Sequence, residues 1–172
     1  MLKTSRLVRS AAAAAAFLLA GSAFAEGTFL PEMGFGYGQG KHIVGTQNTW
    51  LLNAAFGYHF DNGLGARVMY LGDMDPFRGL YASDRSFDDF VGVQATAYMP
   101  VSPRLNLMGG LGIGRTSLNI GGESAGAERV TDGVVSAGLQ WTIVRHYAME
   151  VHVDYLTKTG TSNIVLLAQV PF

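Results

Sequence analysis

The chain has 172 residues, of which 48% are apolar and 15% charged, with 23 glycines and no cysteine. This length fits one domain, the low charge excludes a disordered chain, and the lack of cysteine excludes disulfides, zinc–thiolate sites and a thiol nucleophile. The formal net charge of -1 excludes a general nucleic-acid-binding protein, because such proteins need a basic surface.

Residues 1–25 have the pattern of a secretory signal peptide. An unbroken apolar run at 11–20 precedes an A-x-A cleavage site at 23–25, and basic residues come before the run. The run is too short for a membrane-spanning helix, which needs about 20 residues. We therefore predict export and a mature domain of residues 26–172, with a retained membrane anchor as the alternative. The basic residues are Lys3, Arg6 and Arg9.

The rest of the chain alternates between apolar and small or polar residues, without a sustained helical period. Turn residues separate eight alternating segments, and Asn62-Gly63 is a strong hairpin signal between two of them. We predict one strand for each segment. The predicted strands are Thr28–Gln39, Thr49–Phe60, Leu64–Gly72, Asp89–Met99, Leu105–Thr116, Thr131–Ile143, Tyr147–Leu156 and Asn163–Phe172.

The connections between these segments alternate in length. Outer-membrane barrels have short periplasmic turns and long extracellular loops in this order. The short connections are 61–63, 100–104 and 144–146. The other connections, mostly long and polar, lie near 39–48, 73–88, 117–130 and 157–162.

Aromatic residues gather at both ends of the apolar face, around a band of mainly aliphatic residues. Amphipathic rings prefer the two interfaces of a bilayer, so we expect this face to meet lipid. On the long-loop side the aromatic residues are Tyr37, Trp50, Tyr70 and Tyr155. On the short-turn side they are Phe29, Phe60, Trp141, Tyr147 and Phe172.

The opposite face is rich in glycine and polar residues. A soluble core would bury such residues only at a cost of several kcal/mol for each unpaired charge. In a narrow eight-stranded barrel they can pair with one another and fill the interior. We therefore predict an all-β, eight-stranded antiparallel up-and-down transmembrane barrel with a plugged lumen, without metal or cofactor. The expected polar network of the lumen is Arg67, Gln94, Gln140, Glu150, His152 and Asp154.

Residues 26–172 resemble the small eight-stranded outer-membrane barrels of the OmpA-transmembrane-domain and OmpX type. The resemblance rests on the eight segments, the aromatic girdles and the alternating end Ile164-x-Leu166-x-Ala168-x-Val170-x-Phe172. It implies a place in the outer membrane of a Gram-negative bacterium and recognition of Phe172 by the barrel-assembly machinery. Members of the family anchor the envelope, adhere to host surfaces, resist complement or modify lipids, so we expect a structural role or contact with host or envelope ligands through the loops.

Enzyme chemistry has weaker support. The G-x-S-x-G match at 122–126 needs the strand-to-helix turn of an α/β-hydrolase, whereas here it falls in a glycine-rich loop. Glu150, His152 and Asp154 extend over about 13 Å of strand, too far for one metal ion to bind all three. A lipid A deacylase barrel would have a His-x-Ser pair where this chain has His152-Val153-Asp154. We expect no enzyme; a lipid A-modifying enzyme and a narrow ion channel are the alternatives.

Two features suggest ligands outside the lumen. Arg115 lies at the loop end of its strand in phase with the apolar face, where a guanidinium group suits the phosphates of lipopolysaccharide. A snorkelling interfacial arginine explains the same position equally well. The carboxylates of the loop 73–88 could bind calcium, but its spacing matches no calcium loop and favours a solvated acidic segment.

Overall fold

The computed structural model describes residues 26–40, 47–74, 86–120 and 126–172. The predicted signal peptide lies outside these ranges, as do most of the G-x-S-x-G match and much of the acidic loop 73–88. Within the described ranges, no helix has the length and apolarity to cross a bilayer.

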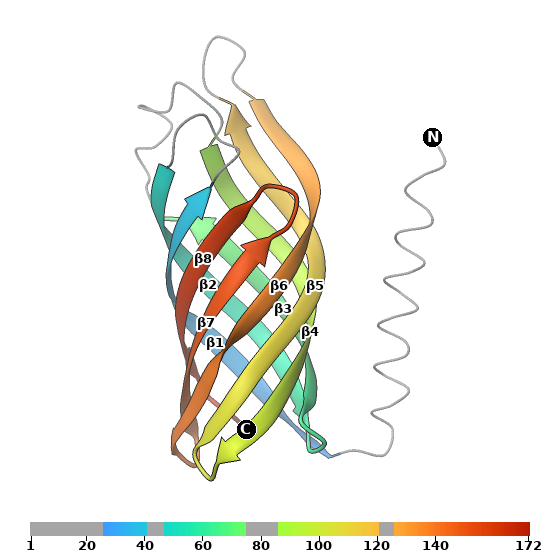
Figure 1. Ribbon diagram of the computed structural model, residues 1–172, viewed down its shortest axis with the longest axis vertical. Helices are drawn as coiled ribbons and strands as arrows, with labels where there is room; N and C mark the ends of the chain where they lie inside the picture. The colour runs from blue at the N-terminus through green and yellow to red at the C-terminus, as the bar shows by residue number, and fades with distance from the viewer. Residues whose placement is uncertain (1–25, 41–46, 75–85, 121–125) are drawn as a thin grey trace, which may run out of the picture.

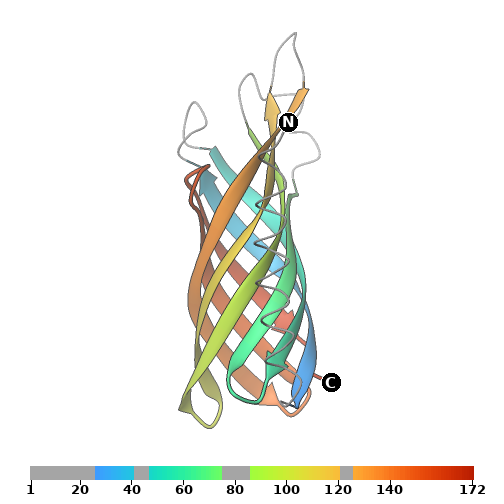
Figure 2. The ribbon, with the colours of Figure 1, turned by 90° about the vertical axis from the view of Figure 1, so that its right-hand side faces the viewer.

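Eight antiparallel strands follow one another around a closed barrel, and the last strand pairs with the first (Figures 1 and 2). This confirms the predicted fold class. Closure leaves no unpaired sheet edge, which hydrocarbon could not satisfy. The strands are β1 (Gly27–Gly40), β2 (Gln47–Phe60), β3 (Leu64–Asp73), β4 (Ser86–Ser102), β5 (Leu105–Ile120), β6 (Gly126–Val144), β7 (Tyr147–Leu156) and β8 (Thr161–Gln169).

Several strands are longer than their alternating patterns. β6 begins at Gly126 rather than Thr131, and β5 continues to Ile120 rather than Thr116. These extensions pair with each other, as in Asn119↔Ala127, although the outward positions of β5 there, Ser117 and Asn119, are polar. The alternating pattern marks only the part of each strand that faces lipid. The backbone hydrogen bonds between the two strands continue beyond that part. The connection 157–160, which we had grouped with the longer ones, is a tight turn.

The C-terminal end closes the barrel by a different route from the predicted one. β8 ends at Gln169, yet Phe172 still exchanges two backbone hydrogen bonds with Phe29 of β1, at 3.1 and 3.2 Å. Val170, which lies between Gln169 and Phe172, donates its backbone N–H to Pro31 O at 3.2 Å. The seam therefore extends to the last residue, although regular strand structure does not.

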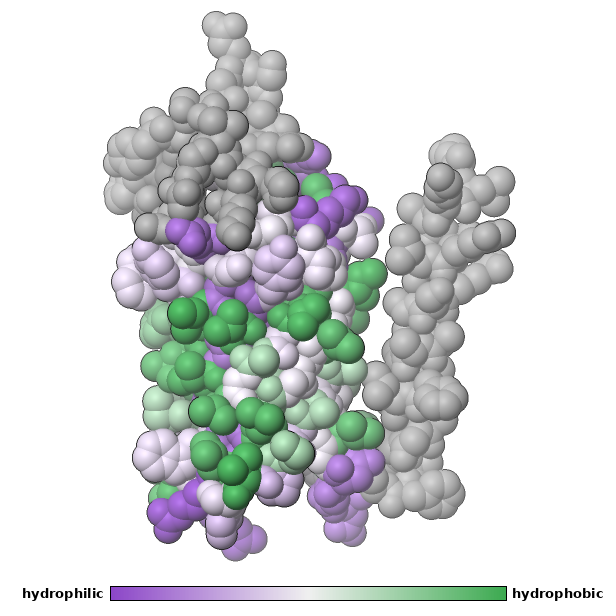
Figure 3. Space-filling model, in the orientation of Figure 1, coloured by the Kyte–Doolittle hydropathy of each residue, from purple (hydrophilic) through white to green (hydrophobic). Residues whose placement is uncertain are grey.

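The outward face forms an apolar belt around the barrel. Figure 3 shows it as a green and white band between hydrophilic ends. Met33 and Leu111 in this belt are 64% and 66% exposed, a degree of exposure that large apolar side chains in a soluble core would not have. Aromatic rings pack together toward both ends, as in Tyr37–Trp50 at 5.4 Å and Phe29–Tyr58 at 4.8 Å between centroids. The belt has the surface of a membrane-spanning barrel.

The inward face is less polar than we predicted. It contains an apolar layer, in which Phe90, Leu51 and Leu71 are fully buried. We had expected the lumen to contain polar side chains and glycines, so the prediction missed this part of the interior. The alternation itself allows it, because these residues occupy inward positions of their strands. The layer consists of Leu51, Met69, Leu71, Phe87, Phe90, Val134, Leu156, Val165 and Leu167.

Glycines on β1 let this strand approach β8 closely. A Cβ atom on Gly34 would lie 1.8 Å from the carbonyl oxygen of Leu166, and one on Gly38 would lie 2.3 Å from Asn163 Oδ1. Gly36 has slightly more room, since its nearest neighbour would be 3.1 Å away. The lack of side chains at these positions therefore allows the β1–β8 seam to close.

Candidate functional site in the barrel lumen

The polar centre of the lumen is an ion pair between opposite walls of the barrel. Arg67 on β3 reaches across to Glu150 on β7, with Nη1 2.9 Å from Oε1. The same nitrogen lies 3.2 Å from Oε2 of Glu32 on β1, and Arg67 Nε donates to Gln94 Oε1 on β4 at 2.7 Å. Each of these four residues is at most 4% exposed. One guanidinium group therefore joins four strands.

Glu150 also receives hydrogen bonds from β4 and from a fifth strand, β8. Its Oε2 atom accepts from the Tyr98 hydroxyl of β4 and from Gln169 Nε2 of β8, both at 2.9 Å. Gln140 Nε2 donates to Gln169 Oε1 at 2.7 Å, and Asn106 Nδ2 donates to Gln140 Oε1 at 2.8 Å. These bonds extend the network around the turn half of the lumen.

His152 lies between two carboxylates of its own strand. Its Nδ1 atom is 2.8 Å from Glu150 Oε1, and its Nε2 atom is 3.2 Å from Asp154 Oδ2. Ser136 on β6 donates a short hydrogen bond to Asp154 and accepts one from Gln94 Nε2 at 2.6 Å. The bonds return through Gln94 to Arg67, which completes a ring of side chains inside the barrel.

The structure joins all six residues of the expected lumen set in one connected network. It adds Glu32, Tyr98, Asn106, Ser136 and Gln169, which the predicted set left out. Each added residue holds an inward position of its strand, so the period-2 pattern contained the signal. Their contacts join residues 18 to 52 positions apart and depend on register and closure, which the pattern does not provide.

The serine, histidine and aspartate in this ring do not form a nucleophile–base pair. Ser136 bonds to Asp154 rather than to His152, whereas an activated serine needs the imidazole as its base. The three residues are at most 4% exposed and point away from the lipid-facing surface. Within the described ranges, no group of three His, Asp or Glu residues is arranged to hold a metal ion.

A second polar cluster lies at the loop end of the lumen, around Asp132 of β6. Its carboxylate accepts from Lys158 N at 2.7 Å, from Thr159 N at 3.1 Å and from Thr159 Oγ1 at 2.7 Å. Thr116 Oγ1 on β5 lies 3.3 Å from the same carboxylate. One buried side chain therefore holds the β7–β8 turn against the barrel wall. Sequence reasoning did not identify this role.

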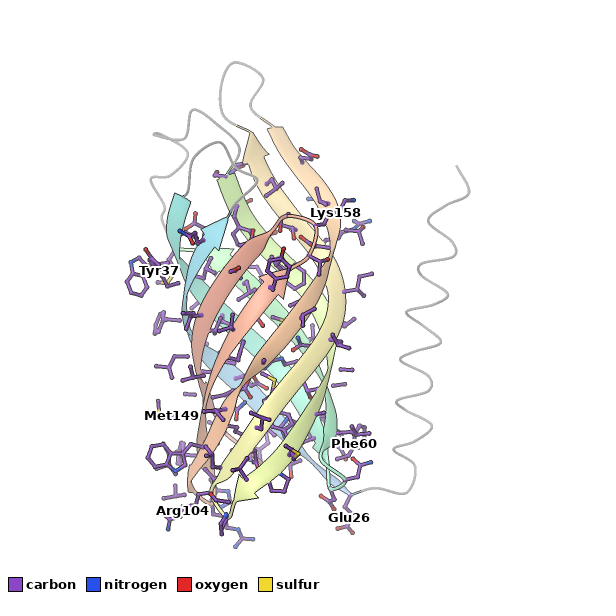
Figure 4. The ribbon with its side chains drawn as sticks, viewed as in Figure 1. Glu26, Tyr37, Phe60, Arg104, Met149 and Lys158 are labelled. Carbon is purple, nitrogen blue, oxygen red and sulfur yellow. The ribbon has the colours of Figure 1, made fainter. Side chains whose placement is uncertain are left out.

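The two site residues predicted outside the lumen lie at opposite ends of the barrel. Arg115 is exposed on the outer face of β5, paired with Val91 of β4 and Thr131 of β6. Phe172 lies at the turn end and is 70% exposed. Figure 4 shows Tyr37 and Lys158 toward the loop end and Phe60 and Arg104 toward the turn end.

The chain is similar to known proteins in its fold but not in its sequence. No protein-family model matches the chain, and no curated protein is similar to it in sequence. Among solved structures, the barrel of Ail from Yersinia pestis is 19% identical with a TM-score of 0.61, over 86% of this chain and 99% of Ail. Neisserial surface protein A is 15% identical with a TM-score of 0.63, over 86% and 99% of the two chains.

The N-terminal barrel domain of OprF from Pseudomonas aeruginosa is also similar, with 16% identity and a TM-score of 0.64. The match covers 86% of this chain and all of that domain. These likenesses confirm the resemblance to small outer-membrane barrels at the level of the fold.

Proposed function

We propose that this protein is an outer-membrane barrel with a plugged lumen, and that it has a structural or surface-interaction role through its loops. The observation that supports it best is the division of side chains between the two faces of one closed sheet. The outward face is an apolar belt, while Arg67 and Glu150 cross the lumen beside an apolar layer. Such a barrel offers its ends, rather than a channel or an enzyme cleft, for contact with other molecules.

In this proposal residues 1–25 direct export and are removed. The short turns then face the periplasm and the longer connections face outside. Ail has been seen in complex with the heparin analogue sucrose octasulfate. This supports the same general kind of role here, in envelope integrity or in adhesion to host or envelope surface ligands.

The proposal also assigns two contacts with envelope components. Arg115, on the outer face toward the loop end, binds phosphate groups of lipopolysaccharide. Phe172, exposed at the end of the β1–β8 seam, is the residue that the barrel-assembly machinery reads.

Fractionation of bacteria that express the full chain tests the proposal. We expect the mature protein in the outer membrane, released by detergent, and migrating differently in gels before and after heating because the barrel survives unheated detergent. Recovery in the soluble periplasmic fraction without detergent would contradict it.

Two further measurements separate this role from the alternatives. A lipid A-modifying enzyme would change the mass spectrum of lipid A when the gene is expressed, whereas we expect an unchanged spectrum. A narrow ion channel would give discrete current steps in planar bilayers, whereas we expect none, because charged and apolar side chains both occupy the lumen.

A further inference from the structure

The lipid-facing surface contains a hollow of about 410 Å³ over β4, β5 and β6. Its floor is a row of three small residues that pair directly across the strands, Ala97↔Gly109↔Ala137. Met99 and Leu107 form the wall on the turn side and are 59% and 44% exposed. A Cβ atom added to Gly109 would meet no atom within 4 Å. The belt is therefore indented at this row of small residues.

Two arginines, Arg104 and Arg145, lie in the turns on the turn side of this hollow. β5 begins at Leu105, and Arg104 precedes it in the exposed β4–β5 turn. Thr142 N donates to Arg104 O at 2.8 Å, which fixes this turn beside β6. Arg145 is exposed in the β6–β7 turn. The two turns, 103–104 and 145–146, contain two arginines and a histidine but no carboxylate.

The spacing between the hollow and the arginines matches the two parts of a phospholipid. Leu105 comes four positions before Gly109, which corresponds to about 10 Å of depth for a tilted strand. Trp141 pairs with Leu105 between them and is 58% exposed, in the position of an interfacial aromatic residue. An acyl chain in the hollow would thus place its phosphate at the level of the turn.

We propose that this face binds one anionic phospholipid of the periplasmic leaflet, with an acyl chain in the hollow and the phosphate group at Arg104 and Arg145. The inference rests on the proposed membrane location. The anionic headgroup follows from the two guanidinium groups, since each basic residue near a membrane surface attracts anionic lipid. Lipopolysaccharide lies at the other end of the barrel, where Arg115 is.

Fluorescence quenching of Trp141 tests this site directly. The chain has two tryptophans, and Trp50→Phe leaves Trp141 as the only one. This variant is placed in phosphatidylcholine bilayers that contain brominated phosphatidylglycerol or, separately, brominated phosphatidylcholine. We expect the phosphatidylglycerol to quench Trp141 more strongly at equal mole fraction, because it occupies the site preferentially.

Two substitutions in this background probe the two halves of the site. Arg104→Gln should lower the relative affinity for phosphatidylglycerol about fivefold, the effect of one basic residue at a membrane surface. Gly109→Leu should fill the hollow and reduce the preference without touching the charge. Ala168→Leu, on the lipid-facing side of β8, is the matched control and should change nothing.

Equal quenching of Trp141 by the two lipids would contradict the proposed site. So would a preference for phosphatidylglycerol that neither Arg104→Gln nor Gly109→Leu reduces. A cross-linked dimer whose formation Gly109→Leu abolishes would also overturn it, in favour of a second copy of the chain. Heat-modifiable migration of the reconstituted protein is checked first. A protein that fails to insert contradicts the proposed function, whereas an inserted protein without lipid preference contradicts this inference alone.

Discussion

Arg67 Nη1 and Glu150 Oε1 lie 2.9 Å apart although their strands, β3 and β7, are on opposite sides of the barrel. The pair is shielded from water, and Glu32 shares the same guanidinium nitrogen. A buried cation between two carboxylates compensates charges that would otherwise be costly inside the barrel. The stability of the barrel should therefore depend strongly on Arg67.

Arg67→Leu should lower the free energy of unfolding by about 3–5 kcal/mol, because Glu32 and Glu150 then remain buried without a cation. Urea unfolding of the barrel in lipid vesicles measures the change. The triple variant Arg67→Leu, Glu32→Gln, Glu150→Gln is the control and should recover much of the loss. A single variant as stable as the parent would show that the ion pair is dispensable.

Gly34→Ala should hinder closure of the barrel. The added Cβ atom would overlap the Leu166 carbonyl oxygen at 1.8 Å, so β1 and β8 would have to separate. We expect a large loss of the heat-modifiable form. Gly36→Ala, whose nearest contact is 3.1 Å, should be tolerated better. Equal assembly of the two variants would contradict the close approach of these strands.

Asp132→Ala should release the β7–β8 turn while the barrel remains folded. Lys158 and Thr159 lose their shared acceptor, at a cost of about 1–3 kcal/mol for the unsatisfied groups. Faster amide hydrogen exchange at these two residues, and faster trypsin cleavage after Lys158, would report the change. Asp132→Asn keeps one acceptor oxygen and should have a smaller effect. Unchanged exchange in Asp132→Ala would mean that other contacts hold the turn.

Deletion of Phe172 and its replacement by alanine should have different effects. The deletion removes both backbone hydrogen bonds to Phe29, whereas Phe172→Ala keeps them and removes only the exposed ring. We expect both variants to assemble poorly in cells, but Phe172→Ala to refold normally in detergent. Normal assembly of both variants in cells would rule out recognition of this ring.

Arg115→Glu should reduce the amount of lipopolysaccharide that purifies with the barrel, because a carboxylate repels the phosphates that a guanidinium group binds. Arg145→Glu, at the turn end, serves as the control and should leave lipopolysaccharide unchanged. The bound amount can be measured as lipid A by mass spectrometry after detergent exchange, so that the phosphate of bound phospholipid is not counted. An equal loss in both variants would point to a general effect of charge.

The sequence predicts the barrel well because lipid imposes a pattern on each strand separately. β7 matches its predicted bounds, Tyr147–Leu156, since all its residues alternate between lipid and lumen. β6 was predicted too short because residues 126–130 pair with β5 outside the apolar pattern. Local pattern thus identifies the strands, whereas their ends depend on pairing with a neighbour.

The lumen is harder to predict because its contacts join distant strands. Arg67 and Glu150 were both expected inside, yet the shared contact with Glu32 depends on the register of β1, β3 and β7 around the closed sheet. Phe90 was missed for a related reason. Alternation places Phe90 inward, as it does the polar residues of the lumen, and does not distinguish it from them. An aromatic side chain fits at this position because Leu71 and Leu156 pack in the same layer.

The hydrogen bonds between Asp132 and the β7–β8 turn bear on whether a foreign peptide can be inserted there. Lys158 and Thr159 are adjacent, and one carboxylate holds both of their amide groups. A peptide inserted between them would move the two amides apart and leave the buried carboxylate only partly bonded. This turn is therefore a poor place for an epitope tag or a natural insertion, and sequence variation there should be limited to residues that preserve both amide contacts.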